Sequence, residues 1–320
     1  MKIVKELNVP TGKILIGEGS KGKLEFLSIG DYGKEKNIKA DFLGLTNEIN
    51  GVPNGDIMPL EKKWVITIST QYGCSMNCTF CDVPKVGVGR NATLNDLQQQ
   101  IIEGLHAFPE VLTTERLNIH FTRMGEPSWN PNVLDCAKWI YDHIDADYPC
   151  HPVVSTMMPK NNIWLKTFVH NWMRSKNRLY RGNAGLQLSI NSTNEDERNK
   201  MFSNNACSLH EISEIMRGTV AVGRKITLNF ALCNYEIDEN VLLRYFNPET
   251  YLIKLTPMHN TASCKVNNIE TKDGYDYFQP YKNVEEKLKK AGYDVIVFVP
   301  SKEEDDSKIT CGNAILSQTI

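Results

Sequence analysis

Short apolar segments alternate with amphipathic helical patterns along the chain after residue 60. Trp64–Ser69 is typical of a strand, and Thr93 with Asp96 three residues later is typical of a capping box that opens a helix. The alternation predicts six strand-then-helix units and a final strand. The predicted strands are 64–69, 117–121, 152–156, 186–190, 226–230, 251–255 and 295–299, and the predicted helices are 93–106, 132–143, 162–173, 209–217, 239–245 and 284–291.

This order of elements predicts the fold class. Repeated βα units favour a parallel sheet with helices outside it. Six units are two short of a full (β/α)8 barrel, so we expect an α/β protein with a partial (β/α)6 open TIM-like barrel. Residues 1–60, with strand-like pieces at 12–17 and 22–30, are expected to form a small N-terminal β-rich segment, and 61–320 the barrel core with a C-terminal extension.

Composition and charge narrow the class of protein. The chain has 320 residues, of which 41% are hydrophobic, and a net charge of -2, which favours a folded globular protein over a disordered one. No apolar run reaches the roughly 18 residues of a membrane helix. The start, Met1–Leu7, lacks the apolar region of a signal peptide. We therefore expect a cytoplasmic protein without a membrane partner.

One stretch departs from the even charge distribution. From Tyr148 to Asn194 there is no Asp or Glu, and basic residues are interleaved with Trp164, Phe168, Trp172 and Tyr180. A basic face with aromatic side chains suits a nucleic-acid backbone and stacked bases. The alternative is a solvated helix whose aromatic side chains face the core.

Three of the nine cysteines lie within eight residues. Cys74, Cys78 and Cys81 follow the first barrel strand at C-x3-C-x2-C spacing, where three thiolates can face one point and hold iron. Three ligands suit a [4Fe-4S] cluster with one iron open. Structural zinc is the alternative, but zinc usually takes four ligands, and no second C-x2-C half lies nearby.

This motif resembles the signature of the radical SAM superfamily, with Phe80 in the aromatic position before the last cysteine. The resemblance implies a cluster that cleaves S-adenosylmethionine (SAM) reductively to a 5'-deoxyadenosyl radical. After the second barrel strand comes Met124-Gly125-Glu126-Pro127. In the superfamily, a Gly-Glu pair at this place holds the amino group of SAM, which assigns that role to Gly125 and Glu126.

The pattern is similar to one subgroup in more detail, the radical SAM adenine methyltransferases of ribosomal RNA. The similarity covers about residues 60–320. It implies SAM contacts for the strand-end residues Ser155, Ser189 and Asn191, and a methyl-carrying role for Cys311 in a late Cys-Gly pair. In that subgroup one SAM methylates the thiol, and a second SAM supplies the radical that moves the carbon onto adenine.

The chain departs from the subgroup at several positions. Thr67 stands where the subgroup has a second cysteine that releases the product, and Asn54 stands at the position of a catalytic Glu. An Asn that contacts SAM falls on His259, with Asn260 beside it. The helical RNA-recognition region of the subgroup has no room in residues 1–60. Cys311 can also be read as a packed thiol.

Three functions therefore stay open. The first is an RNA adenine methyltransferase with Cys311 as methyl carrier. The second is a radical SAM enzyme that abstracts hydrogen from a nucleotide, small molecule or peptide without methyl transfer. The third is a metal-binding or RNA-binding protein without catalysis. The expected partners are an electron donor such as a flavodoxin or ferredoxin and an RNA or nucleotide substrate.

Overall fold

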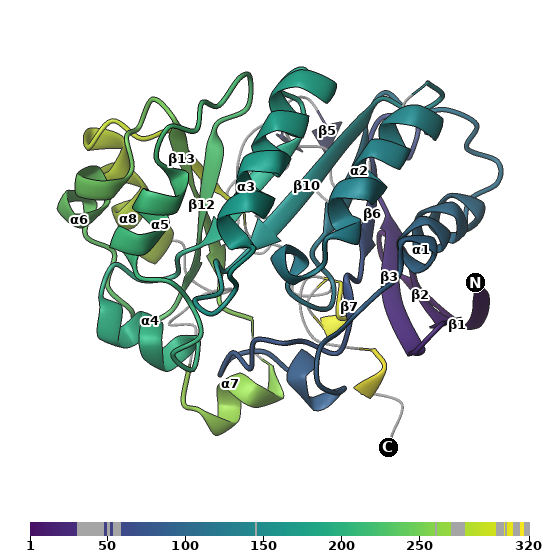
Figure 1. Cartoon of the computed structure of the whole chain (residues 1–320), viewed down its shortest axis with the longest axis horizontal. Helices are drawn as coiled ribbons and strands as arrows, with labels where there is room; N and C mark the ends of the chain where they lie inside the picture. The colour runs from purple at the N-terminus through teal and green to yellow at the C-terminus, as the bar shows by residue number, and fades with distance from the viewer. Residues whose placement is uncertain are drawn as a thin grey trace.

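The computed structural model describes residues 1–30, 48–49, 52–53, 59–144, 146–259, 261–269 and 279–298, with residue 304 and the short pieces 306–309 and 314–316 (Figure 1). Ten strands form one sheet in the order β1-β2-β3-β6-β9-β10-β11-β12-β13-β14. Among the described residues, no helix is long and apolar enough to cross a membrane.

Seven neighbouring strands of this sheet are parallel and form the open barrel. Helices follow the strands and lie outside the sheet (Figure 1). The parallel strands are β6 (Trp64–Ile68), β9 (Leu117–Phe121), β10 (Cys150–Thr156), β11 (Gly185–Ser189), β12 (Ile226–Leu232), β13 (Tyr251–Pro257) and β14 (Val295–Val297). The predicted fold class, a partial TIM-like barrel, is confirmed.

The helices agree with the predicted series and extend it. The predicted ones are α1 (Leu94–His106), α2 (Asn132–His143), α3 (Leu165–Arg174), α5 (Leu209–Met216), α6 (Glu239–Tyr245) and α8 (Gln279–Lys290). The unpredicted ones are α4 (Glu195–Met201), α7 (Ala262–Val266), the short 3-10 helices η1 (Val83–Lys85) and η2 (Pro127–Trp129), and a π-helical turn, η3 (Ser175–Leu179). The capping box predicted for Thr93 and Asp96 is present at the start of α1.

The N-terminal strands extend the barrel sheet. Strands β1 (Lys2–Val9), β2 (Gly12–Gly19) and β3 (Gly22–Ile29) form an antiparallel meander, and β3 pairs antiparallel with β6. Two small hairpins lie apart from this sheet, β4 (Glu48–Ile49) with β5 (Val52–Pro53) and β7 (Gln71–Tyr72) with β8 (Arg90–Asn91). The division of the chain at residue 60 stays a prediction.

The two faces of the parallel sheet differ in polarity. Along β6, the fully buried Trp64, Ile66 and Ile68 alternate with half-buried residues. This alternation places every second side chain under the helices and the others on the inner face. Thr67 in β6 pairs with His120 in β9, so both lie in one row on the inner face. The inner face is therefore the polar one.

The basic and aromatic stretch does not form a stacking surface. Phe168, Trp172 and Tyr180 are buried in the core, and the indole nitrogen of Trp172 donates to the Gly185 carbonyl at 3.0 Å. Even Lys176 is fully buried. The interpretation of this stretch as a base-stacking face is therefore wrong. Phe168 and Trp172 lie on the apolar stripe of α3, which the periodicity of a helix turns toward the sheet, and Tyr180 is buried directly after η3.

Candidate functional site

The three clustered cysteines lie on a loop at the carboxyl end of β6. The loop begins at Gly73, whose φ of +76° is left-handed, and a Cβ there would lie 2.0 Å from the Gly87 oxygen. The loop is held by the Cys74 amide, which donates to the Gly87 carbonyl at 3.2 Å, and by the Thr79 amide, which donates to the Met201 carbonyl at 2.9 Å. These bonds hold the loop against α4 and against the segment around Gly87 that leads into β8.

The structure brings eight of the predicted site residues into one pocket of about 190 Å³ at this end of the sheet. They come from the cysteine loop, the loop after β9, and the strands β10 and β11. They are Cys74, Cys78, Phe80, Cys81, Gly125, Glu126, Ser155 and Ser189. Carboxyl ends of parallel strands meet at one edge of a sheet, which explains why residues so far apart in sequence converge here.

Burial dominates the electrostatics of the thiols. It raises the pKa of Cys74 to about 11 and that of Cys81 to about 12, and it raises the pKa of Cys78 well above its ordinary value. The negative charge of Glu126 raises the pKa of Cys74 further. A cationic metal centre would lower these pKa values instead, because a thiol that coordinates a metal is deprotonated.

Glu126 is buried, and it both accepts main-chain hydrogen bonds and lines the pocket. Its carboxylate accepts the Ser128 amide on Oε1 and the Met157 amide on Oε2, both at 3.0 Å. Burial raises the pKa of this carboxyl, although these hydrogen bonds favour the charged form. The side chains of Thr156 and Ser128 also form hydrogen bonds with this carboxylate, and Glu126 lines the pocket. An ammonium group in the pocket would supply the missing positive charge.

Gly125 is required by its surroundings. Its φ of +92° is left-handed, and a Cβ would lie 2.5 Å from Cβ of Gln71. Gln71 was not predicted as a site residue. Its Oε1 accepts the amides of Glu126 at 3.1 Å and Ser75 at 3.2 Å, so one side chain ties the Gly-Glu pair to the cysteine loop. A glutamine after a strand has no sequence signature for this role.

Helix α7 and the residue before it pack against the end of the cysteine loop, at Phe80 and Asp82. Asp82 Oδ1 accepts the Ser263 amide at 2.9 Å, and the Thr261 hydroxyl donates to the Phe80 carbonyl at 2.6 Å. Cys264 is buried and its sulfur donates to the same carbonyl at 3.5 Å. A second apolar cluster encloses this part of the loop, and it is rich in methionine: Met76, Met157, Met201, Phe202, Ala206, Met258, Cys264 and Ile269.

Several predicted site residues do not line the pocket. The side-chain oxygen of Asn191 accepts the Ala231 amide at 3.0 Å, which commits it to the main chain of β12. His259 lies after β13 and does not line the pocket. Cys311, Asn260 and Asn54 lie outside the described residues. Their roles stay predictions.

The described residues on either side of Cys311 are anchored beside the pocket. Arg123, which lines the pocket, donates to the carbonyls of Lys308 at 2.7 Å and Ile309 at 3.2 Å. Its guanidinium also forms a buried ion pair with Glu25 of β3. Glu25 in turn accepts the amide of Ile315 at 3.1 Å. The N-terminal meander therefore takes part in holding the C-terminal segment at this end of the sheet.

The donor set fits an iron–sulfur cluster better than a single ion. In the part of the chain that the structure describes, no three His, Cys, Asp or Glu side chains are grouped to hold one metal ion. Three thiols are one fewer than the four ligands that a structural zinc ion usually takes. A four-iron cluster takes each thiolate on a different iron and so spaces its ligands more widely. Its iron would also supply the positive charge that the buried thiols lack.

The chain is similar in sequence to RNA methyltransferases of the RlmN group. It is 24% identical over 213 residues to the probable dual-specificity RNA methyltransferase RlmN of Prochlorococcus marinus, covering 63% of this chain and 56% of that protein. It is 24% identical over 275 residues to the RlmN of Marinobacter nauticus, covering 81% and 68%. The chain thus spans little more than half of the first of these relatives. No protein-family model matches it.

Solved structures confirm the class of fold. A radical SAM methyltransferase from Sphaerobacter thermophilus superposes with a TM-score of 0.68 at 16% identity, over 97% of this chain and 80% of that one. This protein therefore has the fold of the radical SAM enzymes. Together with the relatives, this confirms the predicted resemblance to the superfamily and, within it, to the RlmN-like subgroup.

Proposed function

We propose that this protein is a radical SAM enzyme that methylates adenine in RNA. The pocket carries the proposal, because it gathers three thiols, a left-handed glycine and a buried carboxylate at the carboxyl end of the strands. The names of the relatives supply the RNA substrate. An electron donor of the flavodoxin or ferredoxin class would supply the reducing equivalents. The same pocket also fits a radical SAM enzyme that abstracts hydrogen from its substrate without methyl transfer.

One side of the pocket would bind the cluster. Cys74, Cys78 and Cys81 would hold the [4Fe-4S] cluster through their thiolates. Bound there, such a cluster would supply one-electron reduction of SAM, which would cleave a carbon–sulfur bond to give methionine and a 5'-deoxyadenosyl radical. Phe80 and the surrounding methionines keep water away from the thiols, because the apolar cluster encloses the loop.

The opposite wall would orient SAM. Glu126 would hold its ammonium group through the negative charge of its carboxylate, which lines the pocket and is positioned by two main-chain hydrogen bonds. Gly125 has no side chain, and a Cβ at this position would collide with Gln71. Ser155 and Ser189 line the same pocket, where a hydroxyl can hydrogen-bond a polar ligand, and the Ser155 hydroxyl donates to Gln187 Oε1 at 3.2 Å.

Cys311 would carry the methyl group. It is two residues from Ile309 in the sequence, and Ile309 is held by Arg123 on the wall of the pocket. The second thiol of the subgroup is replaced by Thr67, a half-buried residue within β6. A hydroxyl cannot form a disulfide. This replacement favours, as the second candidate, a radical SAM enzyme that abstracts hydrogen without methyl transfer.

Peptide mass spectrometry separates the two candidates. The protein would be loaded with cluster anaerobically and incubated with reductant and SAM that carries a deuterated methyl group, with and without RNA. The proposal predicts a labelled methyl on Cys311 and its transfer to adenine. Cys311→Ala should abolish both, whereas Cys207→Ala, which removes a cysteine distant from the cluster motif in sequence, should leave both. 5'-Deoxyadenosine with unmodified Cys311 would refute the methyl-carrier route and leave the second candidate.

A further inference from the structure

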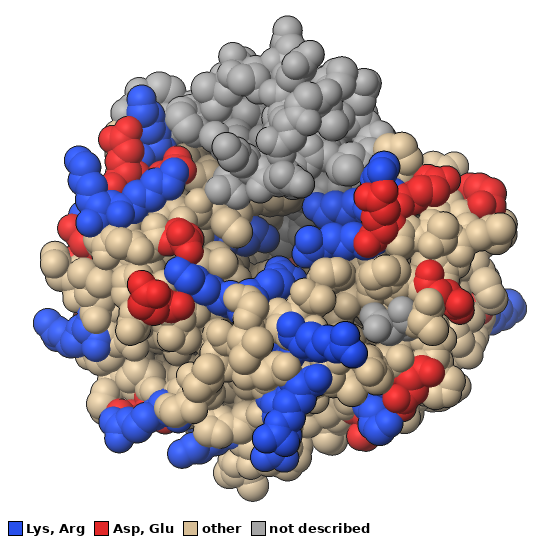
Figure 2. All heavy atoms as spheres, turned by 90° about the horizontal axis from the view of Figure 1, so that it is seen from above, with Lys and Arg blue, Asp and Glu red and all other residues tan. Residues whose placement is uncertain are grey.

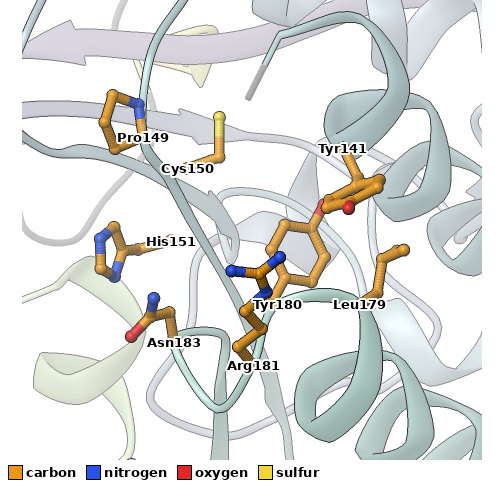
Figure 3. A pocket seen from close by; sticks show the side chains of 8 residues that line it. All are labelled: Tyr141, Pro149, Cys150, His151, Leu179, Tyr180, Arg181 and Asn183. Atoms are coloured by element: carbon orange, nitrogen blue, oxygen red, sulfur yellow. The ribbon is translucent and has the colours of Figure 1, made fainter. Parts of the chain in front are cut away.

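A second cavity lies at the opposite, amino-terminal end of the parallel strands, outside the proposed active site. It has a volume of about 330 Å³ and is lined in part by His151, Tyr180, Arg181 and Asn183. Figure 3 shows His151 and Asn183 on one side of it, and Tyr141, Leu179 and Tyr180 on the other. Nothing in the proposed reaction uses this cavity.

Basic side chains gather at the same end of the sheet because of the strand order. Arg116 directly precedes β9, His151 is the second residue of β10, and Arg224 lies two residues before β12. The amino ends of parallel neighbours meet at one edge, so these three come together although they are far apart in sequence. Viewed from this end, the surface is hollowed and Lys and Arg side chains gather around the hollow (Figure 2).

Hydrogen bonds connect Arg116 and Arg224 to the wall of the cavity. Arg116 Nε donates to Asn118 Oδ1 at 3.1 Å, and Asn118 is the register partner of His151. Arg224 Nη1 donates to the Asn183 carbonyl at 3.2 Å, and Asn183 lines the cavity. The guanidinium carbon of Arg224 also lies 3.4 Å from the Cβ position of Gly185, at the start of β11.

These cations have no carboxylate partner within the described ranges. Neither Arg116 nor Arg224 makes a salt bridge there, and the buried ammonium of Lys176 donates only to the Val222 carbonyl. The carboxylates of Asp294 and Glu115 pair with the neighbouring lysines 225 and 62 instead. A half-buried guanidinium without an anion is costly, because burial removes water without supplying a counter-charge.

The neighbouring bases respond to this excess of positive charge. Burial, followed by the charges of Arg116 and Arg224, lowers the pKa of His151 to about 4. Burial and the charge of Arg116 also lower the pKa of Arg224 to about 10. The buried Nδ1 of His151 makes no hydrogen bond with any described residue. The site thus offers guanidinium donors, an imidazole nitrogen and a surplus of charge.

We propose that this end of the sheet binds a phosphate group, held by Arg116 and Arg224 beside His151. Guanidinium groups match phosphate oxygens with paired N–H donors, which makes phosphate a better fit than a monovalent halide. The phosphate comes either as the free ion or on a small molecule whose organic part enters the cavity beside Tyr141 and Tyr180. A volume of about 330 Å³ is enough for a small metabolite.

Calorimetric titration of the full chain tests this site without SAM or reductant, so its failure would leave the proposed reaction untouched. The probes are inorganic phosphate, AMP and, as the ligand without phosphate, adenosine. We expect phosphate and AMP to bind and adenosine not to bind. Equal affinity for phosphate and AMP identifies the free ion as the ligand, and a tenfold preference for AMP identifies a phosphorylated small molecule.

The variants locate the binding. Arg116→Gln and Arg224→Gln should each weaken phosphate binding at least tenfold, whereas Arg217→Gln should change it less than twofold. Arg217 is exposed and pairs with Glu214, so its variant removes the same charge elsewhere. If the Arg224 variant folds poorly, the Arg116 variant carries the test, because Arg116 is less buried than Arg224. Binding can then be followed by the NMR signal of the His151 ring, which an adjacent anion shifts. Absence of phosphate and AMP binding up to about 10 mM, or equal binding by Arg116→Gln and the wild type, would overturn the proposal.

Discussion

In the pocket at the carboxyl ends of the parallel strands, the buried groups whose pKa is shifted are acids, Cys74, Cys81 and Glu126, whereas at the amino ends they are bases, among them His151 and Arg224. Burial raises the pKa of the acids and lowers the pKa of the bases. Both shifts disfavour the charged form. One end is therefore suited to a cationic ligand and the other to an anion.

The two ends also differ in how their arginines are neutralised. Arg123, beside the cysteine pocket, pairs with the fully buried Glu25. Arg116, at the other end, has only an amide oxygen as side-chain partner among the described residues. The comparison teaches that burial alone does not identify a binding site. A buried charge whose counter-charge is part of the fold is structural, and one whose counter-charge is absent is a candidate for a ligand.

The largest expected effect concerns the thiols at the carboxyl end. Replacement of Cys74, Cys78 or Cys81 by Ala should abolish cluster loading, because three thiolates are the full ligand set that the pocket offers. Iron content and visible absorbance after anaerobic reconstitution measure this. Cys136→Ala removes a buried cysteine of α2 and should load normally. Normal loading of all three single variants would contradict the assignment.

The arginine comparison predicts an unequal loss of stability. Arg123→Met should lower the free energy of unfolding by about 3 kcal/mol, because it leaves Glu25 buried without its partner. Arg116→Met should cost less than about 1 kcal/mol, because it removes a charge that has no carboxylate partner in the described ranges. Urea unfolding measures both. Equal losses would remove the distinction between a structural and a ligand-binding arginine.

A smaller effect is expected for the carboxylate that faces the pocket. Glu126→Gln keeps the shape of the side chain but loses its charge, so SAM affinity should fall at least about tenfold, in line with a charged hydrogen bond of about 1.5–3 kcal/mol. Cluster loading should stay normal. Glu110→Gln removes an exposed charge and is the control. Unchanged SAM affinity in a cluster-loaded Glu126→Gln protein would exclude the carboxylate from SAM binding.

The smallest effect concerns the pH dependence of stability and the histidine on the inner face of the sheet, His120. Burial and the charges of Lys254, Arg224, Lys63 and Arg116 lower the pKa of His120 to about 3. Between that value and the ordinary pKa of about 6.5, the unfolded chain binds more protons than the folded one. Stability should therefore fall as the pH drops below about 6.5, by at most ~1.4 kcal/mol per pH unit from this histidine.

Unfolding measured between pH 4 and pH 6 checks this expectation. His120→Gln should reduce the pH dependence in this window, because one of the two imidazoles with a lowered pKa, His120 and His151, is lost. The exposed His106→Gln should leave the slope as it is. An unchanged slope in His120→Gln would mean that the pKa of this ring is not lowered in the folded protein.

The sequence predicted the barrel well because its signals are local. The alternation along Trp64–Ser69 and the capping box at Thr93 arise from neighbouring residues, and the cysteine motif is a short run. The residues that converge around these thiols were predictable because parallel strands bring their carboxyl ends together. The family resemblance added the identities of Gly125 and Glu126.

The rest depended on packing that leaves no local pattern. Gln71 connects two loops through its amide, and Asp82 binds the start of α7 across a long separation in sequence. The sequence left two interpretations open for the stretch around Trp172, because its basic residues and its buried aromatic residues share a helix, and the structure shows the one in which the aromatic side chains face the core. The basic end of the sheet combines Arg116 and Arg224, which only strand register brings together.

The central claim is that the cysteine pocket supports reductive cleavage of SAM, and formation of 5'-deoxyadenosine tests it most directly. The full chain, reconstituted anaerobically with cluster, would be incubated with SAM and dithionite, and the product measured by chromatography and mass spectrometry. The account predicts 5'-deoxyadenosine from the wild type and none from Cys74→Ala. A wild-type protein that carries its cluster and binds SAM, yet forms no 5'-deoxyadenosine, would contradict it.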